Sequence, residues 1–106
     1  MVTVKNIFVC NPTKSRSKEG IREIRRRVAK QLHEVYGDDI NILDTFFENF
    51  HGNSLQFLGK SISEGLALAD VAVFVDDWEK YDGCRSLHFI ATQYGVKCIY
   101  YCTWTA

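Results

Sequence analysis

The chain lacks features that would place it in a broad functional class at once. It has no excess of either charge, since 13 basic side chains balance 13 acidic ones. General nucleic-acid-binding proteins usually present a basic face, so this balance argues against that class. No apolar run approaches the roughly 20 residues of a membrane span, and residues 1–10 lack the pattern of a secretory leader. We therefore expect a cytoplasmic protein that binds neither nucleic acid in general nor a membrane.

The chain also has little proline and no paired cysteine motif. One proline and seven glycines in 106 residues leave no low-complexity or disordered stretch. The four cysteines include no CxxC pair, and no Cys/His group has zinc-ligand spacing. We expect reduced thiols, no metal and no cofactor, in one domain over residues 1–106.

Strand-like and helix-like segments alternate along the whole chain. Apolar and β-branched residues predict strands over residues 2–10, 40–43, 71–75 and 97–101. Apolar residues at steps of three and four predict three helices: one capped by Ser15 or Ser17 and ended by Gly37, one over residues 55–68, and one marked by residues 87–94.

This alternation predicts an α/β fold of the flavodoxin-like or Rossmann-like kind, a three-layer sandwich around a parallel sheet. Right-handed crossovers place helices on both faces, and four strands favour the order 2-1-3-4. In such sheets, ligands bind beyond the carboxyl ends of the strands where the order reverses. Here that point lies between strands 1 and 3, so the loops over residues 11–17 and 76–85 are expected to form the site.

The first of these loops precedes a helix and is rich in polar groups. It contains Asn11, Pro12, Lys14, Ser15 and Arg16, among others. Amides, hydroxyls and cations before a helix N-terminus are typical of an anion or phosphate cradle. The loop has neither a Walker nor a GxGxxG pattern, so a plain polar loop with a helix cap remains the alternative.

The second loop concentrates carboxylates, namely Asp76, Asp77, Glu79 and Asp82. Loop carboxylates are commonly solvated, but the position at the strand-order reversal favours a role in ligand binding.

Aromatic and cationic side chains share this loop. Trp78 is suited to stacking on a base or sugar, and Arg85 to pairing with a phosphate or carboxylate. A Trp that covers the core is the alternative for Trp78. His88 follows one turn into the next helix, where it is either a ligand-binding or a structural residue.

Two further groups of residues suggest surfaces for partners. The outer face of the first helix carries five cations, which form either a solvated face or an interface for an acidic partner: Arg22, Arg25, Arg26, Arg27 and Lys30. Phe46, Phe47 and Phe50 predict an exposed aromatic patch covered by a second copy of the chain, and hence a homo-oligomer.

Residues 38–101 resemble a family of small, often phage-encoded domains related to nucleoside 2-deoxyribosyltransferases. The matching segments are FLGKS at 57–61, ADVAVF at 69–74, WEKYDGCRSLH at 78–88 and YGVK at 94–97. The resemblance implies a nucleoside or nucleotide ligand held by residues that include Ser61, Gly83, Arg85 and His88. In the transferases a glutamate on the third helix attacks the anomeric carbon of the sugar, as in a retaining glycosidase.

Alignment on Gly83, Arg85 and His88 places Leu87 at the position of that nucleophile, and leucine cannot attack a sugar. Glu64 is the nearest carboxylate to the position where the family carries an acid for base binding. Two hypotheses follow. Either the protein binds a nucleoside, nucleotide or related ribose compound without cleaving it, and so can sequester it, or it cleaves an N-glycosidic bond with a relocated acid: Asp82, Asp77 or Glu64.

Overall fold

The computed structural model describes residues 4–11, 17–43, 45 and 50–101, and these form an α/β fold around a four-stranded parallel sheet. The strands are β1 (Asn6–Cys10), β2 (Asn41–Ile42), β3 (Val71–Val75) and β4 (Lys97–Tyr101), in the order β2-β1-β3-β4. All three pairings are parallel. The sequence-based prediction of a flavodoxin-like three-layer fold with strand order 2-1-3-4 is therefore confirmed.

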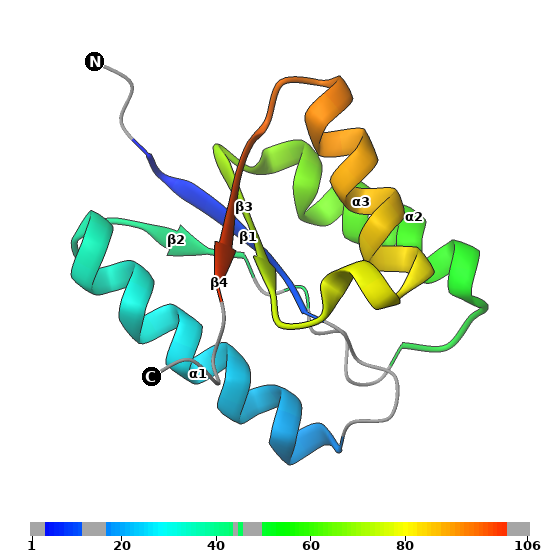
Figure 1. Cartoon of the computed structure of the whole chain (residues 1–106), viewed down its shortest axis with the longest axis horizontal. Helices are drawn as coiled ribbons and strands as arrows, with labels where there is room; N and C mark the ends of the chain where they lie inside the picture. Colours follow the sequence, from blue (N-terminus) through cyan, green and yellow to red (C-terminus); the bar gives the residue numbers. More distant parts are fainter. Residues whose placement is uncertain (1–3, 12–16, 44, 46–49, 102–106) are drawn as a thin grey trace.

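Helices cover both faces of the sheet (Figure 1). On one face lies α1 (Lys18–Tyr36), and on the other lie α2 (Ser54–Glu64) and α3 (Asp82–Gln93). Short 3-10 helices, η1 (Leu66–Leu68) and η2 (Trp78–Lys80), flank β3. None of the helices in the described ranges is long and apolar enough to cross a membrane.

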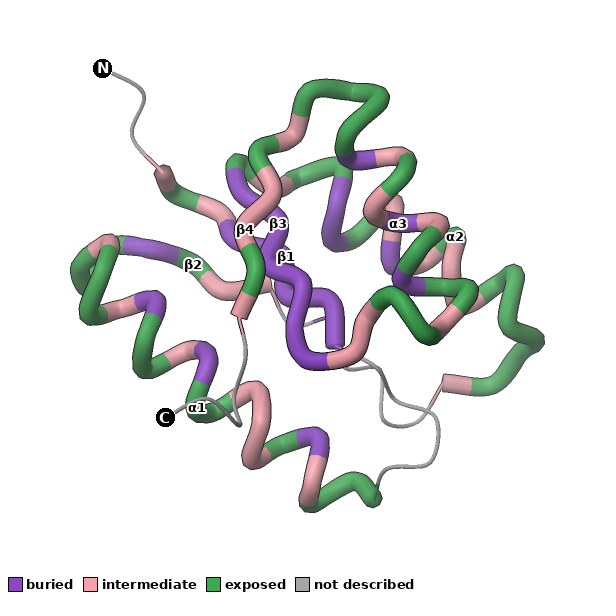
Figure 2. The backbone as a smooth tube through the Cα atoms, in the orientation of Figure 1, coloured by how far each residue is buried: buried purple, intermediate pink, exposed green. Residues whose placement is uncertain are grey.

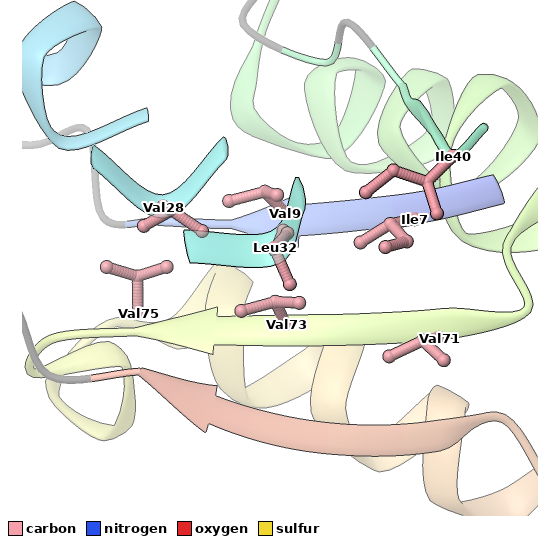
Figure 3. Packing of buried hydrophobic residues seen from close by; sticks show 8 residues of the cluster. All are labelled: Ile7, Val9, Val28, Leu32, Ile40, Val71, Val73 and Val75. Carbon is pink, nitrogen blue, oxygen red and sulfur yellow. The ribbon is translucent and has the colours of Figure 1, made fainter. Parts of the chain in front are cut away.

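Alternate residues of the central strands build two separate apolar layers, because successive side chains of a strand point to opposite faces. Ile7, Val9 and Val73 pack with Val28 and Leu32 of α1 (Figure 3). The opposite layer joins strand residues to α3 and η1, and its buried members are Phe8, Cys10, Leu66, Ala72, Phe74, Cys84, Leu87 and Ala91.

Burial differs sharply between the middle and the edge of the sheet. Every residue of β3 is buried, whereas β4 mixes half-buried and exposed residues (Figure 2). A continuous apolar strand is typical of a parallel sheet covered on both faces. The central, buried position that the sequence predicted for residues 71–75 is confirmed.

The ends of α1 follow from local sequence signals. Ser17 caps the helix by accepting a hydrogen bond from the Gly20 amide at 3.0 Å. Gly37 ends it with a positive φ of 94°, and its amide donates to the His33 carbonyl. Of the two capping residues that the sequence offered, Ser15 lies outside the described residues.

The second helix is shorter than its apolar spacing suggested. It ends at Glu64, and a 3-10 turn replaces the last part of the expected helix. At Gly65 the backbone turns (φ −126°, ψ −82°) so closely against its neighbours that a Cβ there would lie 2.6 Å from Phe8 and 2.7 Å from Thr45. The close approach of backbone to core, which only glycine permits, accounts for the break.

The third helix starts earlier than expected. The sequence predicts a loop over residues 76–85, but residues 82–84 form the first turn of α3, and the Arg85 amide donates to the Tyr81 carbonyl at 3.0 Å. Asp82 in that turn stabilises the start of α3, because its negative charge complements the positive end of the helix dipole. Gly83 is therefore a helical residue, and Asp82 is anchored by the helix.

Candidate functional site

A cavity of about 730 Å³ opens where the sequence predicted a site, beyond the carboxyl end of β1. The end of β1, α1, α2 and the start of α3 all contribute side chains to its wall. Pockets for small molecules commonly have volumes of about 300–1,000 Å³, so this cavity is of ligand-binding size. Among the predicted site residues, the cavity is lined by Asn11, Ser61, Asp82 and Gly83.

Asn11, in the wall of this cavity, has a side-chain donor without a hydrogen-bond partner. The residue is 8% exposed, and its Oδ1 accepts a hydrogen bond from Arg25 Nη1 at 2.8 Å. That bond fixes the orientation of the amide, because an arginine has donors and no acceptor. The buried Nδ2 has no hydrogen-bond partner among the described residues. A buried donor without a partner costs about 1–3 kcal/mol, and a ligand acceptor would remove that cost.

Ser61 adds a second polar group to the wall. It lies on α2, is only 3% exposed, and lines the cavity from the side opposite the sheet. None of the hydrogen bonds in the described ranges involves its hydroxyl, which can both donate and accept.

Arg25 holds the polar end of the cavity together. Its Nη1 also donates to the Val9 carbonyl at 3.2 Å, and its Nη2 donates to the Leu43 carbonyl and to Thr45 Oγ1, both at 3.3 Å. The guanidinium thus ties the end of β1 to the segment that follows β2, and fixes Asn11 in place.

The sequence interpretation placed Arg25 on the outer face of the first helix, either solvated or facing an acidic partner, and for Arg25 the outer position is wrong, because its hydrogen bonds are partly buried. Position 25 lies four residues after Ile21 and three before Val28, both of which are buried. That spacing puts Arg25 on the inward face of α1. The signal was therefore present, but the four other cations assigned to the same face concealed it.

Aromatic side chains form another part of the wall. Phe50 and Phe57 meet edge to face, with ring centroids 5.2 Å apart, and both line the cavity with Tyr81. Phe50 was expected in an interface patch with Phe46 and Phe47, which lie outside the described residues. The patch and the homo-oligomer remain predictions.

Two thiols also line the cavity, Cys10 at the end of β1 and Cys84 in the first turn of α3. A hydrogen bond between these thiols raises the pKa of Cys10, and burial raises it further. The same hydrogen bond lowers the pKa of Cys84. Sequence reasoning gave neither cysteine a role in the site.

Trp78 and His88 lie outside the residues that line the cavity. Their ring centroids lie 4.3 Å apart with the planes tilted by 34°, and His88 Nε2 lies 2.7 Å from the Tyr100 hydroxyl. Phe74 packs against both rings. The structure therefore favours the alternatives in which Trp78 covers the core and His88 is a hydrogen-bonded structural residue.

Arg85 is engaged by its own neighbours. Its Nη1 donates to the Glu79 carbonyl at 2.8 Å, and its Nη2 pairs with the Asp82 carboxylate. Arg85 does not line the cavity, while Asp82 lines it with a side chain that is 89% exposed. Asp82 thus sits at the rim, neutralised by a cation of the same helix.

The remaining carboxylates are apart from the cavity. Asp76 is buried directly after β3, and Asp77, at a positive φ of 57°, lies 3.6 Å from Lys80. Glu64 ends α2 and pairs with Lys60 at 3.5 Å. None of the three lines the cavity. Pro12, like Ser15, falls outside the described residues.

No cluster of three or more histidine, cysteine or acidic side chains suited to a metal ion occurs in the part of the chain that the structure describes. Comparison with protein-family models, curated proteins and solved structures gives no match for this chain. The function is therefore argued from the geometry of the cavity.

Proposed function

We propose that the cavity binds a nucleoside or nucleotide and leaves its glycosidic bond intact. The observation that carries this proposal is the buried, unpartnered Nδ2 of Asn11, a residue in the wall of a cavity that aromatic side chains also line. Nucleobases combine flat aromatic faces with ring carbonyl and nitrogen acceptors. The Asn11 amide suits such an acceptor, and the rings of Phe50, Phe57 and Tyr81 suit the faces of the base.

The small number of carboxylates in the described wall of the cavity supports binding without cleavage. Glycoside hydrolysis generally needs two carboxylates, one on each side of the scissile bond. Asp82 is the one carboxylate among the described lining residues, and it is paired with Arg85. Leu87, at the position of the nucleophile in the resembled transferases, also lines the cavity and is buried.

Calorimetric titration with a panel of nucleosides and nucleoside monophosphates tests the proposal, using the protein and its Asn11→Asp variant. Aspartate keeps an oxygen for Arg25 but replaces the Nδ2 donor with an acceptor. We expect at least one compound to bind the unmodified protein, and the variant to bind it about tenfold or more weakly, in line with the loss of a buried hydrogen bond.

Asn41→Asp is the matched control, because Asn41 Nδ2 donates to Asn6 at an exposed site on β2. It should bind like the unmodified protein. Chromatography after prolonged incubation should recover the ligand intact. Release of the base, abolished by Asp82→Asn, would instead establish an enzyme with a relocated acid.

A further inference from the structure

Cys10 and Cys84 come from distant parts of the chain and meet at the cavity. Cys10 is the last residue of β1, and Cys84 is the third residue of α3. Both are buried in the same apolar layer, and both line the cavity. A small molecule in the cavity would therefore meet both cysteine residues.

The surroundings make the two thiols unequal. Cys84 lies in the first turn of a helix, where the dipole favours a thiolate, and the hydrogen bond from Cys10 lowers its pKa. The pKa of Cys10 is raised by the same bond and by burial, while Arg25 opposes the rise. Cys84 is thus suited to be the attacking sulfur, and Cys10 to be the resolving one.

We propose that Cys10 and Cys84 form a dithiol modification site, at which a hydroperoxide that enters the cavity converts the two thiols into a disulfide. This inference goes beyond ligand binding and does not depend on a nucleoside. Disulfides of this kind in reducing compartments are usually transient and redox-sensing or catalytic.

The chemistry balances with the hydroperoxide as the oxidant. The Cys84 thiolate attacks the terminal oxygen, the O–O bond breaks, and the leaving oxygen takes a proton to become water or an alcohol. The resulting sulfenic acid is attacked by the Cys10 sulfur, which forms the S–S bond. The sulfenic oxygen leaves as water with the proton of Cys10. The thiols lose two electrons in all, and the peroxide gains them.

A disulfide here would join the end of β1 to the start of α3 across the wall of the cavity. It would also restrain Gly83 and its neighbours at the start of α3. The modification would therefore alter the cavity as well as consume the oxidant.

Cys98 provides the internal comparison. It lies on β4, is half-buried, and its thiol donates to the Val96 carbonyl at 3.4 Å. Burial raises its pKa, so it is a poorer nucleophile at neutral pH. It does not line the cavity.

Peptide mapping tests the proposal directly. The whole protein is treated with a small excess of hydrogen peroxide, alkylated, digested with trypsin without reduction, and analysed by mass spectrometry. Trypsin releases Cys10 in the peptide 6–14, Cys84 in 81–85, and Cys98 with Cys102 in 98–106. We expect peptides 6–14 and 81–85 to be linked, with a mass about 2 Da below their sum, and to separate on reduction.

Variants assign the order of the steps. In Cys10→Ser, a sulfenic-acid trap such as dimedone should label peptide 81–85, whereas Cys98→Ser should still form the disulfide. Peptides 6–14 and 81–85 recovered as alkylated thiols, while 98–106 is oxidised, would overturn the proposal. The readout is covalent and uses the unmodified protein, so its failure is distinct from a failure of nucleoside binding.

Discussion

At the scale of single residues, the cavity depends on how polar side chains are held by groups far away in the chain. Asn11 could orient its amide either way, but the Nη1 donor of Arg25 requires that Oδ1 face the guanidinium. The Nδ2 donor must then point away from Arg25, where the described residues provide no acceptor. One arginine on α1 thus determines which end of the Asn11 amide is left without a partner.

Asp70, at the other end of the sheet, is also held by groups far away in the chain. Its carboxylate accepts hydrogen bonds from the backbone amides of Asn6 at 2.8 Å and of Lys5 at 3.0 Å. These bonds lower the pKa of Asp70. The side chain therefore anchors the start of β1 to the residue before β3.

This shift predicts a pH-dependent contribution to stability. A carboxyl whose pKa is lower in the folded state stabilises the fold above its unfolded pKa of about 3.9, and the contribution is lost as the pH falls through the folded value. Asp70→Asn should lower the free energy of unfolding near neutral pH, and this deficit should shrink in acid. Urea unfolding across the pH range measures the effect, with exposed Asp39→Asn as the control. A deficit that does not change with pH would contradict the assignment.

At the scale of elements, local sequence signals located most helix and strand ends. Ser17 caps α1 through Gly20, and Gly37 ends it through His33, so each end of the helix depends only on residues a few positions away. The limits of α1 were therefore predictable. The end of α2 was not, because the break at Gly65 results from contact with Phe8 on β1 and with Thr45. Spacing within a helix carries no information about such a contact.

Gly65 and Gly59 form a matched pair for testing this explanation. A Cβ on Gly65 would meet the Phe8 ring at 2.6 Å and the Ser61 carbonyl at 2.7 Å, so Gly65→Ala should lower the free energy of unfolding by about 1–3 kcal/mol. A Cβ on Gly59, within α2, would meet nothing within 4 Å, so Gly59→Ala should raise it by about 0.5–1 kcal/mol. Denaturant titration followed by circular dichroism gives both values. Equal effects of the two substitutions would show that close packing does not explain the break.

At the scale of the whole molecule, the parallel sheet gives the site its position. The order β2-β1-β3-β4 follows from the alternation of apolar segments, and the cavity lies beyond the carboxyl end of β1, near the predicted reversal point. The cavity therefore lies where the sequence predicted a site, and four of the predicted residues line it: Asn11, Ser61, Asp82 and Gly83.

The spacing on α1 indicates the inward position of Arg25, but the partners of Arg25 and the contact between Cys10 and Cys84 were beyond sequence reasoning, because they depend on pairing between layers. Arg25 turns inward from α1, and Cys10 meets Cys84 only when α3 packs on the sheet. Conversely, Trp78 packs against His88, and His88 Nε2 lies within hydrogen-bonding distance of the Tyr100 hydroxyl. Neither Trp78 nor His88 lines the cavity. Side-chain partners across distant segments decide these outcomes, and residue type alone does not.

Nitrogen–proton correlation NMR with the panel of nucleosides and nucleotides is the most direct test of a ligand site at this cavity. The account predicts that the binding compound shifts the side-chain amide of Asn11 and the backbone amides of Ser61, Gly83 and Cys84, and leaves the indole of Trp78 unchanged. No shift with any compound, or shifts centred on Trp78 and His88, would contradict it.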